Sequence, residues 1–136
     1  MIKKLKPIII STFIITFMSA GTVYAYSSSF GGSWKNGDTI DGSKLNRYYN
    51  LKAGNTNISG TAKVENTNLG ATEKVFIEVR RKTSTGSTRA HYYTSGNYKS
   101  YINFKTSFKA KSGKHYLILR KAQRNVPGSI SGTISQ

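Results

Sequence analysis

The sequence contains no cysteine, only two prolines and only five acidic residues among 136. The absence of cysteine excludes disulfide bonds, thiolate zinc sites, a cysteine nucleophile and a lipid-modified N-terminal cysteine. The shortage of carboxylates limits the acid–base pairs that an enzyme mechanism could use. Against these five acids stand 21 lysines and arginines, so the formal net charge is +16, more than solubility requires. The length allows one ordinary domain and excludes a multidomain enzyme.

The first 25 residues have the three parts of a secretory signal peptide. Lys3, Lys4 and Lys6 precede an uncharged, largely apolar run over residues 7–18, and Val23-Tyr24-Ala25 supplies acceptable residues three and one before a cut. A retained membrane helix is the alternative, but residues 7–24 include several Ser, Thr and Gly residues and barely reach the length of a span. We predict cleavage after Ala25 and secretion of a single domain, residues 26–136, that is extracellular or associated with a cell surface.

The positive charge does not belong to the leader alone. Removal of residues 1–25 takes away three lysines and no acid, which leaves 18 cationic and 5 acidic residues. All five acids lie at or before position 78, whereas residues 79–136 contain 12 lysines and arginines and no acid. The C-terminal half of the chain is therefore a pure cation.

Apolar and polar residues alternate along the mature chain, which predicts short β-strands between turns. The alternation is clear over residues 58–65 and 75–79, and the tetrapeptide Ile-Ser-Gly-Thr occurs at 58–61 and again at 130–133, which we interpret as two strands of similar environment. Further strands are expected at 89–94, 101–109, 115–121 and 129–135, with weaker candidates at 34–40 and 45–51. The turns between them, at 66–70, 83–87, 95–97, 111–114 and 127–128, have the spacing of hairpins.

No stretch of the mature chain has a helical period. We therefore predict an all-β fold, a small antiparallel β-sandwich or jelly-roll-like domain after a cleaved N-terminal signal helix. Residues 115–119 are apolar on both faces, which indicates a central strand covered on both sides. The predicted core comprises Ile58, Val64, Val75, Ile77, Val79, Ile102, Phe104, Phe108, Leu117, Leu119, Ile130 and Ile134.

Candidates for catalysis are few. No Gly-x-Ser-x-Gly elbow and no Gly-rich phosphate loop is present. His115 opens an apolar strand, which favours a structural role, and we expect His91 on the surface or on a binding face. Glu65, Glu73 and Glu78 could supply a glycosidase pair, but Glu73 and Glu78 differ in parity beside a basic strand, so we expect solvated ion pairs. The sequence predicts a protein that is not an enzyme and needs no cofactor.

Residues 36–42, Asn-Gly-Asp-Thr-Ile-Asp-Gly, gather oxygen ligands of the kind that calcium prefers. The alternating ligand spacing and distal glutamate of an EF-hand loop are missing. Two turns built on Asn-Gly and Asp-Gly explain the same residues. We therefore predict no metal site.

The feature of the sequence that indicates a function is the mixture of cationic side chains and tyrosines. If the apolar residues of the strands face inward, the basic residues between them face outward and form one electropositive surface. Tyr92, Tyr93 and Tyr98, close to that charge in the sequence, could stack on sugars or bases or lie at a membrane interface. The residues predicted to contact an anionic partner are Arg80, Lys82, Arg89, Lys99, Tyr101, Lys105, Lys109 and Arg120.

Three classes of partner fit a secreted cation. We favour an anionic polymer, such as a wall polymer or an acidic glycan, held by many weak, salt-sensitive contacts. An anionic bilayer, with about 1 kcal/mol for each basic residue near its surface, is the alternative and implies an antibacterial or membrane-active protein. Nucleic acid is less favoured because the chain is exported. No apolar hairpin of the roughly 9–11 residues per strand needed to cross a membrane stands out, which favours surface attachment over pore formation.

Two short stretches support the antibacterial alternative. Gly31-Gly32-Ser33-Trp34-Lys35-Asn36-Gly37 and the following Arg47-Tyr48-Tyr49-Asn50 resemble the opening of small secreted bacteriocins of the lactococcin type. The rest of the chain departs from that pattern, so the resemblance assigns no residue a role.

Overall fold

The computed structural model describes residues 26–35, 37–65 and 72–136. The predicted signal peptide and the predicted turn at 66–70 lie outside the described residues. Within these three ranges the chain forms nine β-strands and no helix. None of the described residues belongs to a helix that could cross a membrane.

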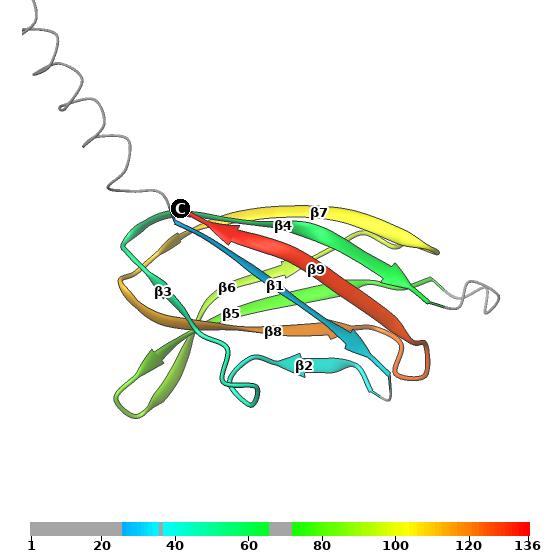
Figure 1. Ribbon diagram of the computed structural model, residues 1–136, viewed down its shortest axis with the longest axis horizontal. Coiled ribbons are helices and arrows are strands. Elements are labelled where there is room, and N and C mark those ends of the chain that lie inside the picture. Colours follow the sequence, from blue (N-terminus) through cyan, green and yellow to red (C-terminus); the bar gives the residue numbers. More distant parts are fainter. Residues whose placement is uncertain (1–25, 36, 66–71) are drawn as a thin grey trace, which may run out of the picture.

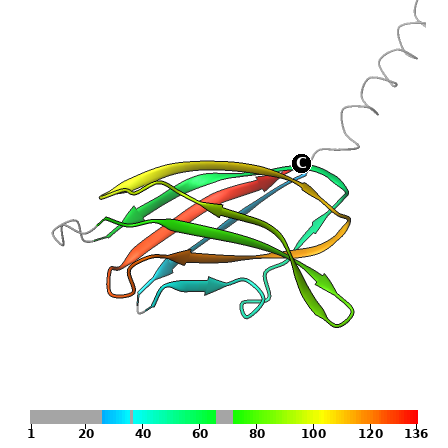
Figure 2. The ribbon, with the colours of Figure 1, turned by 180° about the vertical axis from the view of Figure 1, so that it is seen from behind.

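The strands form two antiparallel sheets that face each other (Figure 1; Figure 2 gives the view from behind). Sheet A has the order β1-β9-β4-β7, with β1 at Ser27–Trp34, β9 at Gly128–Ser135, β4 at Gly54–Val64 and β7 at Tyr101–Ala110. Sheet B has the order β2-β8-β5-β6, with β2 at Thr39–Asp41, β8 at Gly113–Lys121, β5 at Val75–Thr83 and β6 at Gly86–Thr94. The short strand β3, Tyr49–Leu51, also pairs with β8.

The order of pairing is that of a jelly roll. The first long strand pairs with the last, β2 pairs with β8, β4 with β7, and β5 with β6. Such nested pairs arise when a long antiparallel ribbon is rolled into two sheets. The all-β sandwich expected from the alternation is therefore confirmed, and the topology selects its jelly-roll form.

The expectation that the turns close hairpins is correct at only one of the predicted turns that the structure describes. Thr83 pairs with Gly86, so β5 and β6 form a hairpin within sheet B. At 95–97 and at 111–114, in contrast, the chain passes from one sheet to the other. Turn residues specify a reversal of the chain, but they do not specify whether the next strand pairs with the last one or faces it across the core.

The predicted core lies between the two sheets. All twelve predicted residues belong to it: nine are buried, while Val64, Ile102 and Phe108 are partly buried and pack against the others. The central position expected for 115–119 is confirmed, because β8 lies between β5 and the short strands β2 and β3. The predicted core omits the N-terminal contribution, which comes from Phe30, Trp34, Tyr49 and Leu51.

The two Ile-Ser-Gly-Thr segments are neighbours in sheet A. They pair antiparallel, with Gly60 opposite Gly132. A Cβ atom on Gly60 would lie 2.2 Å from the carbonyl oxygen of Ser131, and a Cβ atom on Gly132 would lie 2.3 Å from that of Ser59. Both positions also lie under phenylalanine rings, Phe104 over Gly60 and Phe30 over Gly132. The repeated glycine therefore provides space for rings at the centre of the sandwich.

Candidate functional site

The outer face of sheet B gathers three arginines around one carboxylate. Alternation along the strands turns Glu78 and Arg80 of β5 and Arg120 of β8 away from the core. Glu78 accepts hydrogen bonds from Arg80 Nη1 at 3.0 Å, Arg89 Nε at 2.7 Å and Arg120 Nη1 at 3.4 Å. The cluster thus links β8 and β5, the two central strands of sheet B, to the edge strand β6.

Aromatic rings surround this cluster. The Arg89 guanidinium carbon lies 4.7 Å from the centroid of the Tyr92 ring, and Tyr92 packs against Phe76. On the other side, Lys82 Nζ and Lys114 Nζ lie 5.1 and 5.3 Å from the centroid of Tyr48. We call this surface the arginine face; it comprises Tyr48, Phe76, Glu78, Arg80, Lys82, Ser87, Arg89, Tyr92, Lys114, Tyr116, Ile118 and Arg120.

Contacts within the arginine face hold its side chains in place. The Tyr48 ring meets the Tyr116 ring edge-on at 6.0 Å, and the Tyr116 hydroxyl donates to Ser87 Oγ at 3.0 Å. Arg80 Nε also donates to Ser87 Oγ, at 2.8 Å. Cations held over aromatic faces and in ion pairs have lost part of their rotamer freedom before any ligand arrives. The surface is therefore partly preorganised for binding.

Glu78 is ionised at neutral pH. Burial acts to raise the pKa of its carboxyl group, but hydrogen bonds from Arg89 and Arg80 and the charges of these arginines outweigh burial. The pKa consequently lies below its ordinary value. One negative charge then faces three guanidinium groups, and Lys82 and Lys114 add to the excess of positive charge.

The expectation that Glu73 and Glu78 form solvated ion pairs is wrong, because both residues are buried. Glu73 Oε1 accepts hydrogen bonds from the backbone N–H groups of Lys74, Ala122 and Gln123. Its Oε2 lies 4.0 Å from Nζ of the equally buried Lys121. Glu73 therefore connects the start of β5 to the chain after β8, while Glu78 organises the arginine face.

The structure divides the eight predicted contact residues between different surfaces. Arg80, Lys82, Arg89 and Arg120 lie together on the arginine face. The remaining residues are not part of the arginine face, because β7 belongs to the other sheet: Tyr101, Lys105 and Lys109 face outward from sheet A, and Lys99 lies in the chain between β6 and β7. The single electropositive surface expected from the sequence is therefore not formed, and the role of each residue in binding stays a prediction.

The predicted contact residues omit several members of the arginine face, and three of these are Tyr48, Lys114 and Tyr116. A signal for two of them was present, since Lys114 and Tyr116 share parity with Arg120 in β8. No periodicity could indicate Tyr48, because it precedes a three-residue strand and reaches the cluster only through the pairing of β3 with β8.

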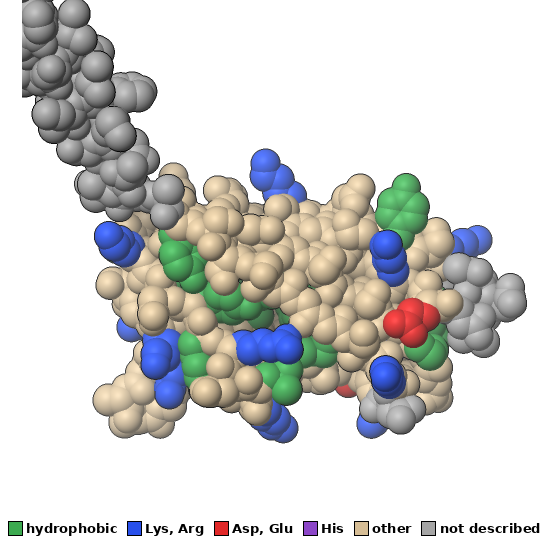
Figure 3. Space-filling view, in the orientation of Figure 1, with side chains coloured by type: hydrophobic (Ala, Val, Ile, Leu, Met, Phe, Trp, Pro, Cys, Tyr) green, Lys and Arg blue, Asp and Glu red, His purple; other side chains and the backbone are tan. Residues whose placement is uncertain are grey.

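The outer face of sheet A is mostly uncharged. Its strands turn hydroxyl and amide side chains to the solvent in registered rows; one row contains Gly31, Ser131, Thr61 and Asn103. Within it, the Thr61 hydroxyl donates to Asn103 Oδ1 at 2.8 Å. Figure 3 shows this side as a broad area with few charged side chains and some apolar ones, with cations mostly toward its margins. The two faces of the sandwich therefore differ in chemistry.

Neither histidine forms a hydrogen bond to a carboxylate among the described residues. His91 faces the interior, contrary to expectation: its ring stacks on Phe108 at 5.0 Å, and its Nε2 lies 2.7 Å from Thr106 Oγ1. His115 is fully buried and donates through Nδ1 to the Gly113 carbonyl at 3.0 Å. Burial lowers the pKa of both imidazoles. Both residues contribute to packing between the sheets.

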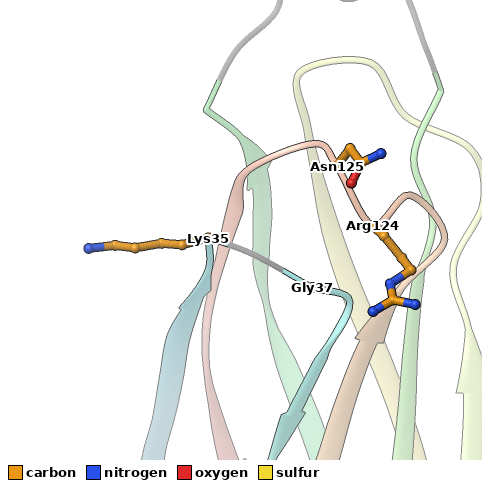
Figure 4. A pocket seen from close by; sticks show the side chains of 4 residues that line it. All are labelled: Lys35, Gly37, Arg124 and Asn125. Atoms are coloured by element: carbon orange, nitrogen blue, oxygen red, sulfur yellow. The ribbon is translucent and has the colours of Figure 1, made fainter.

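Two larger cavities lie at the loops. One, of about 540 Å³, is lined by Lys35, Gly37, Arg124 and Asn125, and Figure 4 shows Lys35 pointing away from Arg124. Its two cations therefore do not converge on one ligand. The other, of about 490 Å³, lies beside β1 and β2 and has Asp41 and Lys44 among its lining residues.

The acidic loop residues act within their own turns. Asp41 Oδ1 accepts hydrogen bonds from the backbone N–H and the hydroxyl of Ser43, at 2.9 and 2.7 Å. The part of the chain that the structure describes contains no group of three or more His, Asp or Glu residues able to hold a metal ion. Asp41 thus stabilises the turn at Asp41-Gly42, as proposed for this pair.

No family model matches the chain, and no curated protein matches it in sequence. Solved structures resemble it in fold. A chain of broad bean stain virus has 12% identity and a TM-score of 0.51, over 80% of this chain and 84% of that one. The pre-peptidase C-terminal domain of a collagenase from Bacillus anthracis has 20% identity and a TM-score of 0.49, over 79% of this chain and 88% of that one. The CBM22-1 xylan-binding domain from Paenibacillus barcinonensis Xyn10C has 14% identity and a TM-score of 0.47, over 79% of this chain and 70% of that one.

Proposed function

We propose that the protein is a secreted, non-enzymatic binding protein whose arginine face attaches to an anionic polymer, such as a wall polymer or an acidic glycan. The observation that carries the proposal is the convergence of Arg80, Arg89 and Arg120 on the single carboxylate of Glu78. Guanidinium groups offer planar pairs of donors that match carboxylate, phosphate and sulfate groups.

The charge balance of the arginine face supports this role. Glu78 offsets one positive charge, whereas three arginines together with Lys82 and Lys114 provide five. Since residues 79–136 contain no acid, β6 and β8 bring no carboxylate of their own to the surface. An excess of positive charge on one side of a protein attracts polyanions and accelerates their association.

The aromatic rings supply a second kind of contact. Tyr92 is 42% exposed beside Arg89, so its ring is accessible to a sugar. Tyrosine beside cations provides apolar area and charge in one place, as a charged glycan requires. Many such contacts of modest strength add up along a polymer and weaken with salt.

The proposal includes secretion of the protein. Cleavage after Ala25 would release the chain that begins at Tyr26, directly before β1. The remaining predicted residues, Lys99, Tyr101, Lys105 and Lys109, lie outside the arginine face and would contact only a polymer that extends beyond it.

A sedimentation or pull-down assay at two salt concentrations tests the function. The ligands are purified anionic wall polymer, an acidic glycan, anionic liposomes and duplex DNA. We expect retention by the polymer or glycan at low salt, release at moderate salt, and binding weakened roughly tenfold in the double variant Lys82→Gln/Lys114→Gln.

The matched control is Lys52→Gln/Lys63→Gln, which removes the same charge from two exposed lysines outside the arginine face. Equal loss in both variants, or binding that is indifferent to salt, contradicts the proposal. Leakage of dye from anionic liposomes, with no retention on polymer, supports a membrane-active protein instead.

A further inference from the structure

A small basic cavity lies where the edge of sheet B meets the end of sheet A. Its volume is about 160 Å³. Its lining residues are Arg81, Thr88, Arg89, Ala90, Lys109 and Lys111.

The two sheets build this cavity together. Arg81 at the end of β5 pairs with Thr88 of β6, and an irregularity in the β5–β6 register occurs just before it, between Val79 and Arg80. Lys109 belongs to the end of β7, and Lys111 follows in the turn to β8. The cavity thus joins Arg89 to Lys109, two residues that the sequence placed on one surface and that the topology assigns to different sheets.

Four cations and no acid line the cavity. In the described part of the chain, only Arg89 among them takes part in an ion pair, with Glu78, and its guanidinium also lies over Tyr92. The stem of Arg81 lies near Gly113, where an added Cβ would be 3.6 Å from Arg81 Cδ. The ion pair and the Tyr92 ring restrain Arg89, although cations gathered in one place repel each other. A bound anion would remove that repulsion.

We propose that this cavity binds a phosphate group, either as a free ion or as part of a phosphate-bearing polymer. Arg81 brings a guanidinium group to the cavity lining, Arg89 has donors besides the Nε–H that Glu78 accepts, and two ammonium groups supply charge for an oxyanion that carries up to about two negative charges. A single carboxylate would satisfy fewer of these donors. The inference deepens the proposed function and rests on it for the polymer, since it names the anionic group that a bound polymer would present.

Titrations of the full-length protein at low ionic strength test the proposal. Binding of inorganic phosphate is measured from shifts in the amide NMR signals of Thr88, Arg89, Lys109 and Lys111. A synthetic poly(glycerol phosphate) and a carboxylate polymer of similar charge density, polyglutamate, are compared by calorimetry. The variant Lys109→Gln/Lys111→Gln changes two exposed lysines of the cavity, and Lys52→Gln/Lys63→Gln removes equal charge elsewhere.

We expect phosphate to shift these four signals, and the cavity variant to bind phosphate or the phosphate polymer roughly tenfold more weakly than the control does. If the cavity variant weakens binding of the phosphate polymer but not of inorganic phosphate, the result also supports the site and identifies a polymer as the source of the bound phosphate group. Equal weakening by both variants, or tighter binding of polyglutamate, overturns it.

The two proposals fail in different ways. If the arginine-face variant weakens polymer binding and the cavity variant does not, the cavity proposal is overturned and the proposed function stands. If the wild type retains no polymer, the proposed function fails, and the titration with inorganic phosphate alone decides whether the cavity is an anion site.

Discussion

Arg89 donates its Nε–H to Glu78 at 2.7 Å, and this bond joins an exposed cation to a carboxylate that is only 4% exposed. The register shift between Val79 and Arg80 occurs on the same stretch of the β5–β6 ladder. Glu78 is therefore the residue that turns three separate basic side chains into one ordered group.

Substitution of Glu78 by glutamine should destabilise the protein. The change leaves three guanidinium groups together without a carboxylate, and loss of one partner from a buried ion pair typically costs several kcal/mol. Because the arginines are partly exposed, we expect a loss of about 2 kcal/mol in the free energy of unfolding, measured by urea denaturation. Glu65→Gln, at an exposed position, is the control and should change stability by less than about 0.5 kcal/mol.

The same carboxylate should contribute to the acid stability of the protein. The pKa of Glu78 in the folded state lies below its ordinary value of 4.5, so its contribution is complete above pH 4.5 and is lost as the pH falls through the folded pKa. The difference in unfolding free energy between wild type and Glu78→Gln should shrink as the pH is lowered from 6 to about 3. A difference that stays constant over this range would disagree with an ionised Glu78.

The two histidines, His115 buried and His91 half-buried, predict a second pH dependence at higher pH. Burial lowers the pKa of His91 and His115 below 6.5, so the folded state binds fewer protons than the unfolded state. Their contribution is complete above pH 6.5 and decreases as the pH falls through the folded pKa values. Urea midpoints of the wild type should therefore decrease from pH 7 to pH 5, and His115→Gln should reduce that slope. An unchanged slope in both His115→Gln and His91→Gln would argue against this origin.

The paired glycines at the centre of sheet A should not accept a methyl group. Gly60→Ala places a Cβ atom 2.2 Å from the Ser131 carbonyl oxygen, where backbone must move. We expect a loss of at least about 3 kcal/mol in unfolding free energy, or failure to fold, seen by circular dichroism and thermal melting. Gly96→Ala, where no heavy atom lies within 4 Å of the new Cβ, should be neutral to within about 1 kcal/mol. Equal effects of the two substitutions would show that Gly60 is not confined.

The leader predicts a defined N-terminus. When the full chain is expressed in a secreting host, N-terminal sequencing and intact mass of the protein from the medium should show a chain that starts at Tyr26. A protein recovered only with membranes, or with residues 1–25 still attached, would favour a retained anchor.

The sequence was sufficient to predict most of the core because burial in a strand leaves a period of two in the residue types. Residues such as Ile58, Val75 and Leu117 show that period directly. Phe30 and Trp34 do not, because they alternate with serine and glycine in β1, and the Trp34 indole finds its partner only across the sandwich, at the Leu119 carbonyl.

The period of two along the strands predicts only part of the candidate site. Parity indicates that Arg80 and Arg120 face outward from their own strands, and the structure agrees. Parity cannot indicate which sheet a strand joins, so Lys105 and Lys109 were grouped with them although β7 lies in sheet A. Parity likewise cannot indicate the burial of Glu78, because that burial arises from arginines on three strands and not from neighbours in the sequence.

The sequence alone determines the excess of positive charge and the acid-free C-terminal half of this protein. It also determines the β-strands and the side of each strand that faces the core, since these features depend on composition and local alternation. The tertiary structure decided the jelly-roll order, the burial of Glu73 and Glu78, and the meeting of Arg89 with Lys109 at one cavity. Those features depend on pairing between residues far apart in the chain, and the hydrophobic pattern is the same whichever sheet a strand enters.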